Sequence, residues 1–282
     1  MNAYKHSIVG IVLFFITATA IADINVGIFP RRKAGQMYTM FKPITEQLST
    51  RLGEKVNLIV PKNFKAFWKD LNSGRFDLVH YNQYHYIKSH KELGYNVILA
   101  NKEFGDKKVS GMVAVRTDSG INTIEELKGK TVMFGGGKKA MMSYIIPTYL
   151  LKQQGLRPGI DYQEKFALNP FAAIIATYDG HADAVGNGEV ILSLKRVKQR
   201  VDIDKIKILS SSKPVIFLPW AVKKDMNVEK INIIQNFMVD LKNTTEGKKM
   251  LKKAMINEFY VVEDKEYDYI RELVEKAIGE KY

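Results

Sequence analysis

Short apolar runs alternate with segments of helical periodicity along the first third of the chain. The runs at 24–29, 56–60 and 76–81 are rich in β-branched, aromatic and aliphatic residues, and each is expected to form a strand. In the segments 41–52 and 64–71, apolar residues recur three or four positions apart, which predicts amphipathic helices. This β-α-β-α-β order predicts a parallel, doubly wound sheet with helices on its faces.

The same alternation continues beyond residue 110. Residues of about 111–212 are expected to form a second α/β unit of similar size, followed by C-terminal helices. In this unit a helix ending at Gln154 contains Pro147, which should bend it or occupy a position where no N–H is needed. The other expected elements are strands at 97–100, 109–115, 131–134, 166–168, 182–185 and 215–222, and helices at 84–93, 171–178, 191–197, 228–242, 247–255 and 265–278.

Residues 1–22 have the pattern of a targeting segment. Lys5 and His6 precede an apolar run at 8–16, and Ala20-Ile21-Ala22 provides a small-x-small end. This pattern predicts a secretory signal peptide that is cleaved after Ala22. The apolar run is shorter than the roughly 20 residues that cross a bilayer, which disfavours a membrane anchor. The mature chain is therefore expected in a Gram-negative periplasm.

The chain of 282 residues carries 43 Lys and Arg against 30 Asp and Glu, a formal charge of +13. Such an excess suits an acidic partner, either a phosphate-bearing ligand, nucleic acid or an anionic membrane. Export counts against nucleic acid, and exposed lysines would account for part of the excess. The segment 31–35 is expected to be a loop with three cations. Cys is absent, which excludes disulfides, thiolate metal sites and cysteine nucleophiles.

The glycine run Gly135-Gly136-Gly137 stands between an expected strand and an expected helix. In this arrangement free backbone N–H groups and the positive end of the helix dipole point toward a ligand. Lys138 and Lys139 follow and favour an anion. A nucleotide P-loop is not matched, because Ala140 stands after the lysines. A tight turn that needs glycine geometry is the alternative interpretation.

A second candidate region follows the third expected strand. Ligands of open α/β sheets bind beyond the carboxyl ends of strands, and Tyr81 and Asn82 there can stack on and hydrogen-bond a small solute. His80, His85 and His90 are five residues apart rather than four, so they do not align on one helical face. No acidic set accompanies them, and a metal site is not expected.

Signals for catalysis are poor. The chain has no G-x-S-x-G motif, and Ser143 has no evident base near it in the sequence. Met141 and Met142 diverge by about 100° on a helix, so they are not expected to ligate copper together. We therefore assign no catalytic residue, no cofactor and no metal.

Several segments in a fixed order identify a family. They are INVGIFP, FKPITEQLSTRLGEKVNLIV, SGRFDLVHYNQYHY, LKGKTVMFGGG, SYIIPTYLLKQQGL, DGHADAVGNG and LPWAVKKDM. In these segments the chain resembles the phosphate/phosphite/phosphonate type of ABC-transporter solute-binding protein, which has the type II periplasmic binding fold.

The resemblance implies two lobes, each a doubly wound mixed sheet with helices on both faces. Lobe 1 would be residues 23–110 plus 213–282 and lobe 2 residues 111–212, joined by strands that cross near 109–115 and 209–216. The implied function is the solute-binding subunit of an ABC import system. Such a protein, expected to be a monomer, closes on a small anionic or polar solute and releases it to a permease in the inner membrane.

Two other functions fit the same fold. A periplasmic sensor would present its ligand to a membrane signalling protein. An enzyme of this fold, as in thiamine-precursor synthesis, normally works inside the cell, so the signal peptide counts against it.

The resemblance also implies site residues. Tyr81 matches a tyrosine that lines the family's pocket, and Asn169 stands where a histidine is often found. The family's Ser-Thr-Ser-like run, which catches the oxyanion, corresponds here to Ala140-Met141-Met142, so simple phosphonates, phosphite and phosphate are expected to bind poorly. An acid used by aminophosphonate binders corresponds to about Leu218. The expected ligand-binding residues are Tyr81, Asn82, Gly136, Gly137, Lys138, Lys139, Met141, Ser143, Asn169, Asn187 and Trp220.

Overall fold

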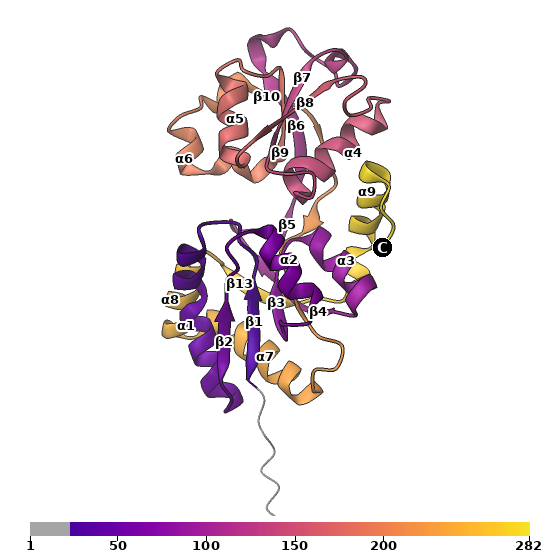
Figure 1. The fold of residues 1–282 in the computed structure, drawn as a ribbon. Helices are drawn as coiled ribbons and strands as arrows, with labels where there is room; N and C mark the ends of the chain where they lie inside the picture. The colour runs from indigo at the N-terminus through magenta and orange to yellow at the C-terminus, as the bar shows by residue number, and fades with distance from the viewer. Residues whose placement is uncertain (1–22) are drawn as a thin grey trace, which may run out of the picture.

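The computed structural model describes residues 23–282, which form two α/β lobes, one above the other in Figure 1. The predicted signal peptide at 1–22 lies outside the described residues. Each lobe has one mixed sheet covered by helices on both faces, so the predicted fold class is confirmed. Within residues 23–282, no helix is both long enough and apolar enough to cross a membrane.

Lobe 1, the lower lobe in Figure 1, is built on a six-stranded sheet with the order β13-β4-β12-β3-β1-β2. Its strands are β1 (Ile24–Ile28), β2 (Val56–Ile59), β3 (Leu78–His80), β4 (Asn96–Lys102), β12 (Pro219–Val222) and β13 (Glu258–Val261). Its helices are α1 (Ala34–Leu52), α2 (Phe64–Asn72), α3 (Gln83–Leu93), α7 (Val228–Asp240) and α8 (Thr245–Ala254). β1 is parallel to β2 and β3, as predicted, but β12 separates β3 from β4 and is antiparallel to both.

Successive side chains of β3 point to opposite faces of this sheet. Leu78 packs in the apolar cluster that also holds the buried residues of α1, α7 and α8. Val79 packs in the other cluster, with buried residues of α2 and α3. The helix α1 begins at Ala34, so the basic loop is shorter than expected and α1 longer.

Lobe 2 is built on a five-stranded sheet with the order β10-β6-β9-β7-β8. Its strands are β6 (Gly111–Arg116), β7 (Thr131–Gly135), β8 (Gln163–Ala167), β9 (Ala184–Gly188) and β10 (Ile206–Ser211), and its helices are α4 (Ile146–Gln153), α5 (Pro170–Tyr178) and α6 (Lys195–Lys198). A π-helical turn, Met141–Ile145, precedes α4. Pro147 therefore lies in the first turn of α4, where a backbone N–H is not needed.

The chain crosses between the lobes at a two-stranded antiparallel sheet, β5 (Lys108–Val109) with β11 (Val215–Ile216). The strands expected at 109–115 and 215–222 are therefore each divided in two, because the chain changes sheets within each apolar run. The last helix, α9 (Asp268–Ile278), packs against α4 of lobe 2 as well as α3 of lobe 1 (Figure 1). The residue ranges given above for lobe 1 (23–110 plus 213–282) and lobe 2 (111–212) remain predictions.

Candidate functional site

The two lobes meet where the carboxyl ends of the lobe 1 strands face lobe 2. β1 and β3 are parallel neighbours, so the loops that follow them leave the sheet side by side (Figure 1). Asn82, in the loop after β3, caps α3 by accepting a hydrogen bond from the backbone N–H of His85 (2.8 Å). Its Nδ2 donates to the carbonyl oxygen of Lys139 in lobe 2 (3.2 Å). Asn82 thus links the two candidate regions found in the sequence.

The glycine run after β7 is required by local geometry. A side chain at Gly135 would place its Cβ only 2.4 Å from the Cα of Pro170, so β7 and the start of α5 can approach only because this residue has none. Gly136 has a φ of +104°, a conformation that side chains rarely adopt. The alternative interpretation of the run, a turn that needs glycine, therefore holds for Gly135 and Gly136.

Replacing Gly135 by Ala is expected to lower the free energy of unfolding by about 2–3 kcal/mol, because the new methyl group would overlap backbone atoms of Pro170. Gly137→Ala is the matched control, since a Cβ there would meet nothing within 4 Å. Urea unfolding of both variants gives the difference. Equal stabilities would contradict the close approach of β7 and α5.

The two lysines of the loop are already paired with carboxylates. Lys138 Nζ lies 2.9 Å from Glu164 Oε2, and Lys139 forms an ion pair with Glu280. Both carboxylates come from segments far away in the sequence, which is why the lysines were expected to be available for an anion. In this structure their charges are compensated by these carboxylates, and anion binding at this loop stays a prediction.

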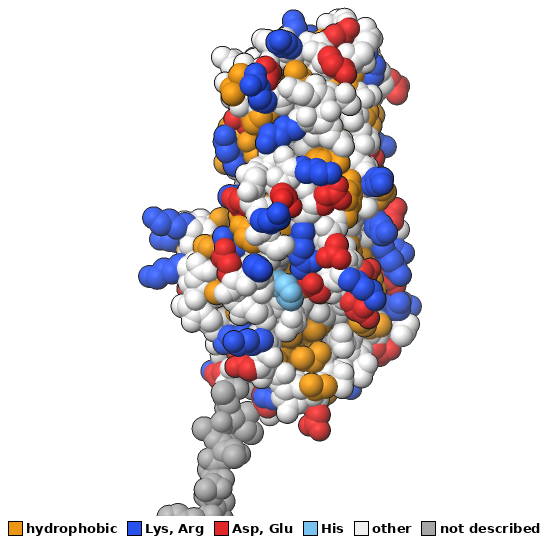
Figure 2. Space-filling view, turned by 90° about the vertical axis from the view of Figure 1, so that its right-hand side faces the viewer, with side chains coloured by type: hydrophobic (Ala, Val, Ile, Leu, Met, Phe, Trp, Pro, Cys, Tyr) orange, Lys and Arg blue, Asp and Glu red, His pale blue; other side chains and the backbone are white. Residues whose placement is uncertain are grey.

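Glu280 ties the C-terminal segment to both lobes. Besides pairing with Lys139, its carboxylate accepts hydrogen bonds from the hydroxyls of Tyr84 in α3 (2.7 Å) and Tyr282 (2.5 Å). Partial burial raises the pKa of Glu280, but the hydrogen bonds from Lys139, Tyr282 and Tyr84 outweigh it and hold the pKa at about 2. Figure 2 shows this side of the molecule, where acidic and basic side chains are interspersed and the surface continues from one lobe to the other.

The ionised form of Glu280 should therefore stabilise the fold above its ordinary pKa of 4.5, and the contribution should disappear as the pH falls toward 2. Since the side chain is 33% exposed, solvent screening limits the effect to about 1 kcal/mol. We expect Glu280→Gln to be less stable than wild type in urea at neutral pH and the gap to narrow in acid. Glu275→Gln, in α9 just before this segment, is the control, and a stability gap that does not depend on pH would contradict the account.

Four other predicted site residues lie inside the protein. Tyr81 is fully buried among core residues of lobe 1, and its hydroxyl lies 2.8 Å from the Oγ of Ser89. Trp220 is 1% exposed and packs on the opposite face of the sheet. Met141 belongs to the core, and the hydroxyl of buried Ser143 donates to the carbonyl oxygen of Gly135. These four were expected to bind the ligand, and in this structure they are buried.

Asn169 and Asn187 both organise the start of α5. Asn169 caps this helix by accepting from the backbone N–H of Ala172 (2.9 Å). Buried Asn187 donates from Nδ2 to the carbonyl oxygen of Pro170 (2.8 Å). Their amides are thus used to fix lobe 2, next to the glycine run.

The histidines have structural partners. His80 is bonded through Nδ1 to the carbonyl oxygen of Pro219 (3.0 Å) and stacks on Trp220 with ring centres 4.5 Å apart. Burial, followed by the charges of Lys139 and Lys88, lowers the pKa of His85 to about 3, so its ring is neutral. No group of three or more His, Asp or Glu residues suited to a metal ion is found within residues 23–282.

A buried polar network that the sequence did not predict begins at the basic loop. Arg31 donates from both terminal nitrogens to the carboxylate of Glu103 (3.1 and 2.9 Å). Glu103 also accepts from Asn101 Nδ2 (2.9 Å), and Asn101 in turn accepts from the indole N–H of Trp220 (2.8 Å). Through Asn101, Trp220 therefore helps to hold Glu103, the carboxylate that pairs with Arg31. The three cations at 31–33 were the sequence signal, but nothing local indicated Glu103.

The pKa of Arg32 in lobe 1 is affected by a charge in lobe 2. Partial burial, followed by the positive charges of Arg31 and Arg196, lowers the pKa of Arg32. Arg196 lies in α6, with its guanidinium carbon 4.9 Å from the ring centre of Phe171. The short helix 195–198 carries three cations, and the sequence does not indicate that the charge of one of them acts on the loop after β1.

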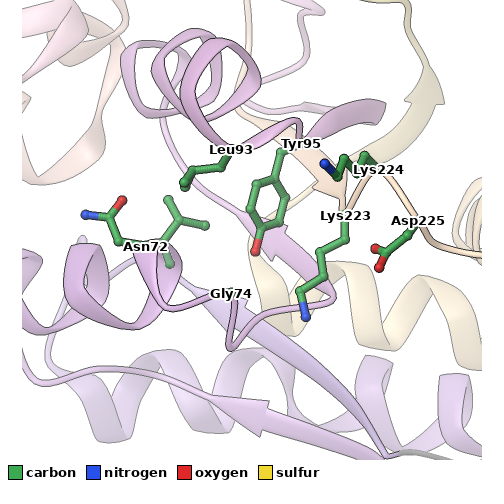
Figure 3. A pocket seen from close by; sticks show the side chains of 8 residues that line it. Asn72, Gly74, Leu93, Tyr95, Lys223, Lys224 and Asp225 are labelled. Atoms are coloured by element: carbon green, nitrogen blue, oxygen red, sulfur yellow. The ribbon is translucent and has the colours of Figure 1, made fainter.

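A pocket of about 210 Å³ lies elsewhere, at the end of lobe 1 opposite these loops (Figure 3). Two of its polar side chains already have partners within lobe 1. Lys223 donates to Asp77 (2.9 Å), and the hydroxyl of Tyr95 donates to the carbonyl oxygen of Phe76 (2.6 Å). We therefore do not assign the solute to this pocket.

Solved structures confirm the fold. A Xanthomonas citri protein bound to ATP is 14% identical, with a TM-score of 0.78 and coverage of 90% of this chain and 96% of that chain. A Prochlorococcus marinus protein in complex with methylphosphonate is 18% identical, with a TM-score of 0.72 and coverage of 90% and 97%. A binding protein component of an ABC phosphonate transporter from Pseudomonas aeruginosa is 16% identical, with a TM-score of 0.71 and coverage of 89% and 85%. At these identities the likeness shows the fold alone.

Comparison of the sequence with known proteins gives information beyond the fold. The tetrathionate sensor histidine kinase of Salmonella typhimurium is 27% identical over 162 residues, which are 54% of this chain. The chain spans only about a quarter (26%) of the length of that kinase. A family model described as "ABC transporter, phosphonate, periplasmic substrate-binding protein" matches residues 26–267. The match takes in both sheets, and the chain belongs to this family of periplasmic substrate-binding proteins of phosphonate-type ABC transporters.

Proposed function

We propose that this protein captures a small anionic solute between its two lobes and delivers it to an inner-membrane permease. The observation that supports this most strongly is the match of the family model, which covers residues 26–267 and so takes in both lobes. A solute that contacts both lobes binds the closed form better than the open form, so it shifts the population toward closure. No chemical step is part of this function.

The interlobe connections suit such a movement. The chain crosses at only two short strands, β5 and β11, which pair by two residues each. The remaining contacts between the lobes include the packing of α9 on α4, the hydrogen bond from Asn82 to Lys139 and the ion pair of Lys139 with Glu280. Exposed ion pairs of this kind contribute about 1 kcal/mol or less, so they can rearrange when the lobes move.

Mass spectrometry of small molecules released from protein purified out of the periplasm tests this proposal. We expect an anionic solute in amounts comparable to the protein, absent from an unrelated periplasmic protein purified in parallel. Protein that releases no solute and whose melting temperature does not rise in an ultrafiltrate of periplasmic extract would contradict the proposal, because a bound ligand stabilises the native state.

We also propose that the mature protein is a periplasmic monomer that begins at Asp23. The support is the Ala20-Ile21-Ala22 pattern of the signal peptide. N-terminal sequencing of periplasmic material should start at Asp23, and light scattering should give the mass of one chain. Material that starts at Met1 or fractionates only with membranes would contradict this.

Ligand sensing is the second candidate, and the similarity to a tetrathionate sensor histidine kinase favours it. In this case the closed form would contact a membrane signalling protein instead of a permease. A gene for such a protein beside this one would favour sensing, and permease and ATPase genes would favour transport. Calorimetric titration with tetrathionate adds a direct test, since tight binding would support the sensory alternative.

A further inference from the structure

The C-terminal helix contacts both lobes. α9 follows β13 of lobe 1 and packs against α3 of that lobe, and it also packs against α4 and the π-helical turn of lobe 2 (Figure 1). Lys152 in α4 donates a hydrogen bond from Nζ to the carbonyl oxygen of Lys276 in α9 (3.4 Å). The helix is therefore a connection between the lobes that is separate from the crossing strands β5 and β11.

Residues 279–282, which follow α9, continue this connection. The carboxylate of Glu280 forms an ion pair with Lys139 of lobe 2 and accepts a hydrogen bond from the hydroxyl of Tyr84 of lobe 1 (2.7 Å). The hydroxyl of Tyr282 donates to the same carboxylate (2.5 Å). A single carboxylate at the end of the chain is thus bound from both lobes at once.

Tyr282 is fixed to lobe 1 by contacts of its own. Lys88 in α3 donates from Nζ to the Tyr282 hydroxyl (3.2 Å), and this Nζ lies 5.1 Å from the centre of the Tyr282 ring. The rings of Tyr84 and Tyr282 meet edge to face with centres 6.0 Å apart. Lys139 Nζ lies 4.9 Å from the centre of the Tyr84 ring. The cation from lobe 2 therefore contacts the aromatic pair that holds the end of the chain.

These contacts do more than end the helix. Gly279, with a φ of +74°, already ends α9 by donating its backbone N–H to the carbonyl oxygen of Glu275 (2.8 Å). The partners of Glu280 lie in α3 and in the loop after β7, far away in the sequence. The side chains of Glu280 and Lys139 are 33% and 47% exposed, so their ion pair can break and re-form without unfolding a core.

We propose that residues 279–282 form an interlobe latch, which holds the lobes in the relative position described here and is closed by the ion pair of Glu280 with Lys139. Opening the latch leaves the lobes joined by the crossing strands and the packing of α9. The latch thereby sets the population of this arrangement relative to others, and with it the affinity for any solute that contacts both lobes. It acts in the solute-free protein and so goes beyond the proposed function.

Distances between spin labels on the two lobes, measured by double electron–electron resonance, test the latch. The chain has no Cys, so Lys69→Cys and Lys165→Cys introduce the two labelling sites. Both positions are exposed, one in α2 of lobe 1 and the other in β8 of lobe 2. The labelled protein is freed of solute by unfolding and refolding, and we expect one main distance when the latch is intact.

Glu280→Gln and Lys139→Gln each remove the ion pair that closes the latch. A contact of this kind changes an equilibrium about two- to fivefold, so each variant should raise the fraction of molecules outside the main distance by this factor. The double variant Glu280→Gln/Tyr282→Ala also loses the contacts with Lys88 and Tyr84, and should raise the fraction about tenfold.

Two matched controls separate the latch from a general loss of charge. Arg157→Gln removes an ion pair with Asp161 inside lobe 2, and Glu272→Gln removes one with Lys276 inside α9. Both should leave the distances unchanged. Unchanged distances in the double variant, or equal changes in the controls, would overturn the latch. Unaltered circular dichroism of each variant excludes misfolding as the cause.

The latch and the proposed function fail in different ways. If the double variant keeps the distances of wild type while an ultrafiltrate of periplasmic extract raises the melting temperature of wild type, solute capture stands and the latch is wrong. If the distances change but the ultrafiltrate stabilises neither protein, the latch stands and solute capture is wrong. If neither effect is seen, both are wrong.

Discussion

Glu103→Gln is expected to lower the free energy of unfolding by about 3–5 kcal/mol, the usual cost of removing one partner of a buried ion pair. Glu103 is 3% exposed and accepts hydrogen bonds from Arg31 and Asn101. The amide of Gln carries no charge, so the positive charge of the Arg31 guanidinium is left uncompensated. Two N–H donors of Arg31 then face this side chain, but only its single oxygen can accept a hydrogen bond.

Urea unfolding monitored by circular dichroism measures this effect. Glu46→Gln is the matched control, because Glu46 pairs with Lys42 on the surface of α1 with both side chains more than half exposed. That variant should lose no more than about 0.5 kcal/mol. A free energy of unfolding for Glu103→Gln within about 1 kcal/mol of wild type would be well below the usual cost of breaking a buried ion pair. Such a result would mean that the network does not hold the basic loop.

The second large effect concerns simple phosphonates. Wild type is expected to bind methylphosphonate, phosphite and phosphate poorly, because the turn before α4 offers no free hydroxyl. Ala140 and Met141 have none, Met141 is buried, and the hydroxyl of Ser143 is used by Gly135. Each charge-assisted hydrogen bond is worth about 1.5–3 kcal/mol, so the loss of two weakens binding by roughly two to four decades.

Calorimetric titration with methylphosphonate tests this expectation. A variant with Ala140→Ser and Met142→Ser, at the two half-buried positions of the turn, should bind methylphosphonate more tightly by at least about one decade. Met226→Ser, half-buried in lobe 1 beyond β12, controls for the loss of a methionine. Submicromolar binding of methylphosphonate to wild type would contradict this interpretation of the turn.

The order of strands and helices was predictable because hydrophobic periodicity is a local property. The pairing of β12 between β3 and β4 was not, since it joins segments that are far apart in the sequence. The division of the apolar runs at Ser110 and Phe217 was missed for a related reason. The residues on both sides of each division are apolar, so the sequence pattern shows no break there. The strands are divided because the chain crosses between the lobes at these points.

The site was less predictable than the fold. The glycine run and Asn82 were identified, and the structure brings them together. The ion pairs of the two lysines in this loop could not be predicted, because Lys138 and Lys139 pair with Glu164 and Glu280 from distant segments.

Small-angle X-ray scattering tests most directly whether solute is captured by closure of the lobes. Purified protein, freed of solute by unfolding and refolding, would be measured with and without an ultrafiltrate of periplasmic extract, and with the same ultrafiltrate after its anions are removed on an exchange resin. We predict a smaller radius of gyration with the complete ultrafiltrate and no change with the anion-depleted one. A profile that stays the same in the complete ultrafiltrate, although calorimetry shows saturation, would contradict capture by closure.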